Sequence, residues 1–161
     1  MKQPILLVLS SALALASLSG CGRSEDEVKK LVQLQSEVSQ LHGDIYKKMT
    51  ELGKVAGQPD ELLARQEAWL ASHPRQRTVF QNDDIDSAKQ RISSAFDAID
   101  SWKTLPSETY EEQVKKLTSD REFLKSAISK IDAAIKAASE ASESHKKILA
   151  RLTSSTGKPK Q

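Results

Sequence analysis

Few residues of this chain are capable of chemistry, and they are scattered along it. There is one cysteine, Cys21, and the three histidines, His42, His73 and His145, lie far apart from one another. A zinc site needs several Cys, His or acidic ligands at short spacing, so we expect no metal. The sequence also lacks a glycine-rich phosphate loop, a serine-elbow pattern and a metal-binding His-Glu motif. It therefore predicts a protein that is not an enzyme and that has no cofactor.

Cys21 ends an apolar leader. Lys2 gives the leader a positive start, and the apolar run from Ile5 to Leu18 follows. That run has about 14 residues, whereas a helix needs roughly 20 to cross a bilayer. The small residues Ser19 and Gly20 then precede the cysteine, as at the cleavage site of a secretory signal.

The sequence Leu18-Ser19-Gly20-Cys21 resembles the lipobox of bacterial lipoproteins. The resemblance covers only the first 21 residues. It implies cleavage before Cys21, diacylglyceryl attachment to the thiol, and acylation of the new N-terminus, with palmitate among the chains. Several acyl chains would anchor the protein firmly to a membrane. Gly22 follows the cysteine, where enterobacterial lipoproteins retained in the inner membrane have Asp. The resemblance therefore implies the outer membrane, facing the periplasm, with the periplasmic face of the inner membrane as the alternative.

Composition predicts one all-α domain after the leader. The 24 basic and 22 acidic residues are intermixed and give a net charge of +2, which argues against a nucleic-acid partner. Aromatic residues make up only 4% of the chain, and no long period-two alternation occurs. We expect a signal peptide at residues 1–20, a helical bundle at 21–153 and a flexible basic tail at 154–161.

The first expected helix runs from Ser24 to about Val55. Ser24 and Glu27 form a capping-box pattern. Gly57 and Pro59 follow as a stop signal, in which the glycine is expected to take a left-handed conformation.

A second arm extends from about Asp60 to Leu105, with an irregular joint at 73–82. The last arm, from Ser107 to Thr153, carries an apolar stripe on 4-3 spacing, typical of a coiled-coil seam. Short connections favour antiparallel neighbours. The sequence predicts an elongated antiparallel bundle of three long arms, the middle one interrupted. A four-helix bundle and association of several chains through the seams are alternatives.

Arg121, Ser142 and His145 interrupt the last stripe. Polar residues in such a seam most often set register or oligomeric state. A sharper interpretation pairs His145 with an acid such as Glu143 or Asp44.

Residues of the joint are the preferred candidates for contact with a protein partner. Arg75, Arg77 and Phe80 lie in a break between helices, where recognition residues are common. A loop with one packed phenylalanine and solvated arginines would look the same. Trp102 is a further candidate because Trp is frequent in binding hot spots, although packing in the core is the default for it.

The C-terminal region is basic. No acid follows Ser144, whereas Lys146, Lys147 and Arg151 lie in the last turns of the expected helix. A favourable helix dipole accounts for this pattern. Contact with an anionic surface, such as phospholipid or peptidoglycan, is the functional alternative.

These features favour a membrane-anchored lipoprotein, tethered through Cys21, that acts as a non-enzymatic helical binding module. We expect it to be an accessory component of an envelope assembly of the secretion, transport or exclusion type. A cell-wall spacer and a small-ligand or stress-sensing bundle are the alternatives.

Overall fold

The computed structural model describes residues 22–155, except for the side chains of residues 77, 78 and 155. All the regular elements within 22–155 are helical. They are α1 (Glu25–Val55), α2 (Gln58–Ser72), the short 3-10 helix η2 (Pro74–Val79), α3 (Asp83–Asp100) and α4 (Tyr110–Ser155). The expected all-α fold is confirmed.

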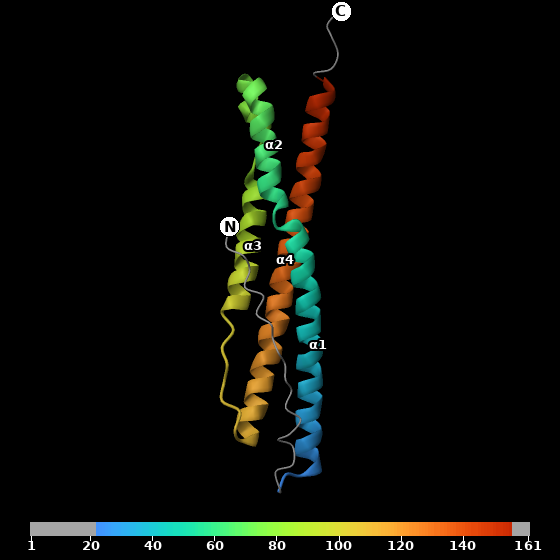
Figure 1. The fold of residues 1–161 in the computed structure, drawn as a ribbon, viewed down its shortest axis with the longest axis vertical. Coiled ribbons are helices and arrows are strands. Elements are labelled where there is room, and N and C mark those ends of the chain that lie inside the picture. Colours follow the sequence, from blue (N-terminus) through green and yellow to red (C-terminus); the bar gives the residue numbers. More distant parts are fainter. Residues whose placement is uncertain (1–21, 156–161) are drawn as a thin grey trace, which may run out of the picture.

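The helices form an elongated bundle of three arms (Figure 1). α1 and α2 follow one another in nearly the same direction and make up one long bent arm. The chain reverses at η2 and returns through α3 and the extended segment 101–109, and α4 then runs back along the bundle. The three-arm architecture is as predicted, but the first reversal lies at 73–82 and not at 56–59.

The backbone at Gly57 explains why the first arm bends without reversing. Gly57 has φ −85° and ψ −11°, a right-handed conformation, so the expected left-handed geometry was wrong. Pro59 lies in the first turn of α2, where its missing N–H breaks no helical hydrogen bond. The segment from Gly57 to Pro59 therefore ends α1 and begins α2 in nearly the same direction.

Capping boxes fix the beginnings of the two longest helices. The Ser24 backbone N–H donates to Glu27 Oε2 at 2.9 Å, and the Glu27 N–H donates to Ser24 Oγ at 3.3 Å. This confirms the predicted box. Thr109 and Glu112 form an equivalent pair before α4, at 3.0 and 3.2 Å, which the sequence analysis did not identify. The backbone N–H groups of Thr109 and Glu108 also lower the pKa of the Glu112 carboxyl.

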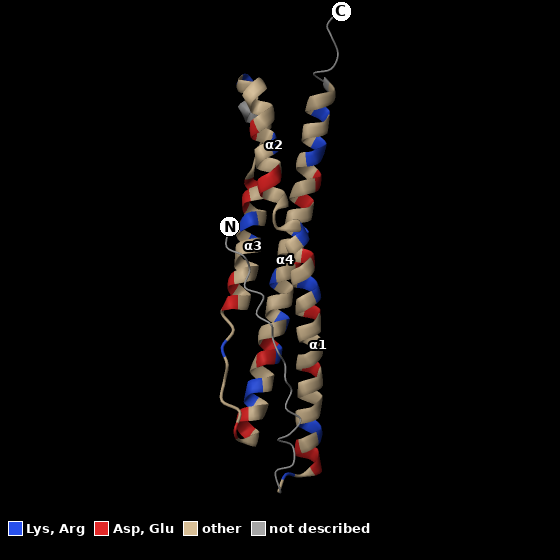
Figure 2. Cartoon of the chain, viewed as in Figure 1, with Lys and Arg blue, Asp and Glu red and all other residues tan. Residues whose placement is uncertain are grey.

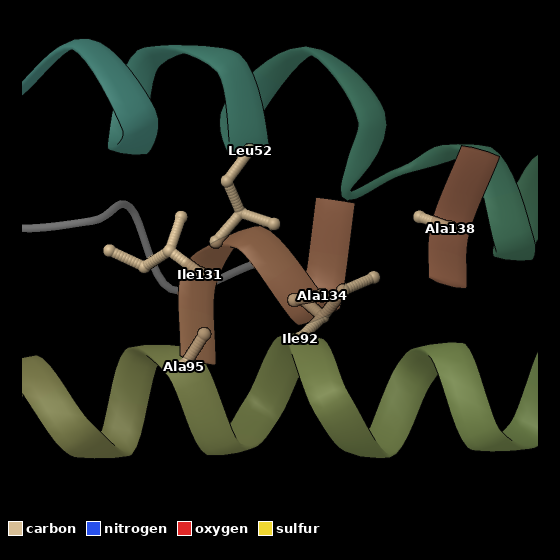
Figure 3. Close-up of a cluster of buried hydrophobic side chains, with 6 residues drawn as sticks. All are labelled: Leu52, Ile92, Ala95, Ile131, Ala134 and Ala138. Atoms are coloured by element: carbon tan, nitrogen blue, oxygen red, sulfur yellow. The ribbon is translucent and has the colours of Figure 1, made fainter. Parts of the chain in front are cut away.

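The core follows α4, which packs against both α1 and α3. In Figure 3, Leu52 of α1 and Ile92 of α3 approach Ile131 and Ala134 of α4 from opposite sides. Leu124, Ile131, Ala138 and His145, which lie on the predicted 4-3 stripe of α4, are almost fully buried. Three alanines outside that stripe are equally buried: Ala127, Ala134 and Ala141. Small side chains lie where α4 meets both neighbours, because there is room for little else.

Candidate functional site

The joint lies at one end of the bundle, beside the last turns of α4 (Figure 1). We call this end the distal tip; it comprises residues 63–82 and 145–155. The first residue of α1, by contrast, lies at the opposite end. Cys21 and its leader fall outside the described residues, so the lipidation of Cys21 stays a prediction.

An aromatic cluster organises the distal tip. The rings of Trp69 and His73 stack at a centroid distance of 4.2 Å, and Phe80 meets Trp69 edge-on at 5.8 Å. His73 Nδ1 is also 3.0 Å from the Trp69 carbonyl oxygen. The cluster ties α2 to the returning chain and holds Phe80, one of the predicted partner residues, against the helix. Arg75 is exposed nearby on η2, and the side chain of Arg77 is not described.

A groove lies between α2 and the joint. Its volume is about 610 Å³, and its apolar lining comes from Leu63, Leu70, Ala71, Pro74 and Phe80. Gln66, Glu67 and Asn82 add polar groups to the lining. The buried Oδ1 atom of Asn82 has no hydrogen-bond partner among the described residues. We call this feature the joint groove; it offers a partner an apolar recess next to polar groups.

A second groove lies between α2 and the end of α4. It has a volume of about 420 Å³ and includes Lys146 in its lining. We call it the α2–α4 groove. Of the other predicted basic residues, Arg151 is exposed and Lys147 lies 3.8 Å from Glu143. Figure 2 shows basic residues and no acidic ones on the last turns of α4.

A buried polar network closes the base of the distal tip. His145 is 1% exposed, and its Nε2–H donates to Asp84 Oδ1 at 2.8 Å. The Gln66 amide, also buried, contacts His145 Nδ1 and acts as the donor for this tautomer. Nearby, Ser142 Oγ donates to Gln58 Oε1 at 2.6 Å. The network therefore joins α2, α3 and α4.

The polar residues of the α4 seam each bridge to another arm. Arg121 donates to Glu37 of α1 at 3.1 Å, and Ser142 and His145 reach α2 and α3. This supports the interpretation of these residues as register-setting. The acid that pairs with His145 is Asp84. The prediction that this acid is Glu143 or Asp44 was therefore wrong.

Trp102 lies apart from the joint residues. α3 ends at Asp100, earlier than expected, and Trp102 belongs to the extended segment 101–109. Its Nε1–H donates to the buried Asp120 at 3.0 Å, which is about 38 Å from His145 along α4. Its ring lies 5.1 Å from His42 and 6.1 Å from Phe123. These contacts fasten the extended segment to the bundle.

The ring of His42 is partly buried beside Trp102. Burial lowers the pKa of His42 from its ordinary value of 6.5, with the charge of Asp120 opposing the shift and Lys116 adding to it. Its Nδ1 atom is buried and has no hydrogen-bond partner among residues 22–155.

The interactions of Gln66, Asp84 and Asp120 were not predicted from the sequence. The sequence held one indication that Gln66 interacts, because a glutamine among apolar residues at helical spacing requires a hydrogen-bond partner when it is buried. Asp84 and Asp120 gave none, since acidic residues are common throughout the chain.

The described residues contain no group of three or more His, Cys, Asp or Glu side chains suited to hold a metal ion. Within residues 22–155, no helix has the length and apolar character needed to span a membrane. Comparison of the chain with protein-family models, with curated proteins and with solved structures finds no match.

Proposed function

We propose that this protein is a lipid-anchored, periplasm-facing binding module of the outer membrane whose distal tip docks a protein of an envelope assembly. It has no catalytic role. The assembly is of the secretion, transport or exclusion type, and the docked segment inserts apolar side chains into the joint groove.

One observation carries the proposal: the joint groove and the start of α1, which Cys21 shortly precedes in the sequence, lie at opposite ends of a rod (Figure 1). Cys21 comes three residues before the Ser24 cap. α1 has 31 residues and α2 has 15, which together rise about 70 Å at 1.5 Å per residue. A protein tethered at Cys21 would therefore carry the aromatic tip far from the bilayer.

The position of the basic residues at the end of α4 also favours some binding partners over others. Lys146, Lys147 and Arg151 lie at the distal tip, so an upright rod would hold them away from the membrane that anchors it. Electrostatic attraction to lipid head groups fades within a Debye length, about 10 Å. Contact with peptidoglycan or with a protein fits this placement better than contact with the anchoring bilayer.

Docking is tested by filling the joint groove with a long side chain. Ala71 is exposed and lines the groove, so Ala71→Arg blocks it without removing any packed residue. Ala68 is also exposed, on the same helix, and lines neither groove, so Ala68→Arg is the matched control. We expect in-cell crosslinking from Gln76 to capture a defined protein, and Ala71→Arg alone to abolish the capture. Equal capture by both variants would contradict docking in the groove.

The cell-wall spacer gives a different result in the same cells. A spacer sediments with peptidoglycan, yields no discrete protein crosslink at Gln76, and is indifferent to Ala71→Arg. The anchor is tested separately by fatty-acid labelling. Cys21→Ser is expected to abolish the incorporation of palmitate, and undiminished labelling would refute the lipobox interpretation.

A further inference from the structure

We infer that the α2–α4 groove binds a single-chain fatty carboxylate, with its head group at Lys146 and its alkyl chain against Trp69. This site is separate from the joint groove and does not depend on the docking of a protein partner.

α2 and α4 diverge toward the distal tip (Figure 1). The contact between Gln66 and His145 joins the two helices, and the side chains beyond it leave a volume of about 420 Å³. Ligand pockets for small molecules have volumes of about 300–1,000 Å³. The lining residues are Arg65, Trp69, Lys146, Leu149, Ala150 and Thr153.

The floor of the groove is apolar and its aromatic part is held in place. Trp69 of α2 and Leu149 and Ala150 of α4 supply its apolar lining. Stacking on His73 and the edge contact with Phe80 fix the indole ring, so a ligand meets a preorganised surface.

The charge of the groove selects an anion. Two lining residues are cations and none is an acid. Arg65 is already bound to Glu61 at 2.5 Å, whereas Lys146 forms no ion pair within residues 22–155. Lys146 is exposed and can lay its stem along the apolar floor while its ammonium group meets the head group.

The size of the groove favours one alkyl chain over a docked helix. Lys146 and Thr153 span about 10 Å along α4, and Arg65 and Trp69 about 6 Å along α2. A helix bound between α2 and α4 needs contacts with both helices over at least two turns of its own length, or about 11 Å, whereas α2 lines the groove over only about 6 Å. A diacyl lipid would likewise need room for a second chain.

Trp69 itself reports binding. The chain has two tryptophans, and Trp102 lies in the separate contact with Asp120, so a full-length Trp102→Phe chain has Trp69 as its only indole. The probe is decanoate, added below the concentration at which it forms micelles. We expect saturable change in Trp69 emission, and weaker binding of hexanoate by roughly fourfold for each methylene that no longer contacts the groove.

Two controls separate the head group from the chain. Decyl maltoside has the same alkyl chain and a neutral head, so it should bind at least tenfold more weakly than decanoate. Lys146→Gln should weaken decanoate binding by a similar factor, whereas Lys147→Gln, at the neighbouring residue paired with Glu143, should leave it nearly unchanged.

Each alternative occupant gives its own result, and each overturns the inference. Equal affinity for decanoate and decyl maltoside means a nonspecific apolar surface. A response to vesicles of anionic phospholipid but not to decanoate means a bilayer contact. A response only to a peptide that combines acidic and aromatic residues means a protein site. Equal losses in Lys146→Gln and Lys147→Gln mean that overall charge, and not this groove, attracts the anion.

Discussion

Replacing Ile131 with alanine tests whether α4 is the centre of the bundle. Ile131 is fully buried and packs in one cluster with Leu52 of α1 and Ile92 of α3 (Figure 3). Truncating a buried isoleucine to alanine costs about 2–5 kcal/mol, depending on how far the site collapses. Two neighbours in the cluster, Ala95 and Ala134, are too small to fill the space. We therefore expect a loss of about 3–4 kcal/mol in the free energy of unfolding.

Ile135 provides the matched control because it is the same residue on the same helix, one turn further on. It packs against the same cluster but is only half-buried. Ile135→Ala should cost about half as much as Ile131→Ala. Urea unfolding followed by circular dichroism measures both, and the melting temperature of Ile131→Ala should fall by about 10 °C. Equal losses in the two variants would refute the orientation of α4.

Three further predictions concern polar groups. His145→Leu leaves the buried Gln66 amide without a hydrogen-bond partner and should lower the free energy of unfolding by about 1–3 kcal/mol. Adding Gln66→Leu should restore part of that loss. A double variant less stable than His145→Leu would show that the two residues are not coupled in this way. Ser24→Ala and Thr109→Ala should each cost about 1 kcal/mol by urea unfolding, while exposed Ser36→Ala should be neutral; a neutral Thr109→Ala would remove the second capping box. Because burial lowers the pKa of His42, the unfolded chain binds a proton that the folded chain resists, so stability should fall as pH drops below 6.5. His42→Phe should flatten this part of the pH profile, and parallel profiles would contradict the burial of His42.

The sequence predicted those parts of the fold that depend on local patterns. The Ser24 capping box, the irregular joint at 73–82 and the buried half of the α4 stripe all follow from residue type and spacing. The direction of the chain after Gly57 did not follow, because a Gly-x-Pro segment can end one helix and begin the next with equal ease. The deciding factor was packing: α2 contacts α4 and α3, and this required it to continue beyond the end of α1.

The candidate site was predictable only in part. Phe80 and Arg75 were expected at the joint because the joint itself was visible in the sequence. The α2–α4 groove brings together Trp69 and Lys146, which lie more than 70 residues apart in the chain. No spacing rule within one helix reveals such a pair. The contact between Trp102 and Asp120 was hidden for a different reason, because an extended segment replaces the helix expected at Trp102.

The most direct test of the account is the distance between the two ends of the first arm. Cys21→Ser gives a chain without cysteine, in which labels can be attached at Lys30→Cys and Ser72→Cys, both exposed positions. An arm in which α2 continues α1 separates these residues by about 60 Å, whereas a reversal at Gly57 would bring them to about 20 Å. Distances measured between spin labels near the first value support a rod that holds its tip far from its anchor, and distances near the second would contradict it.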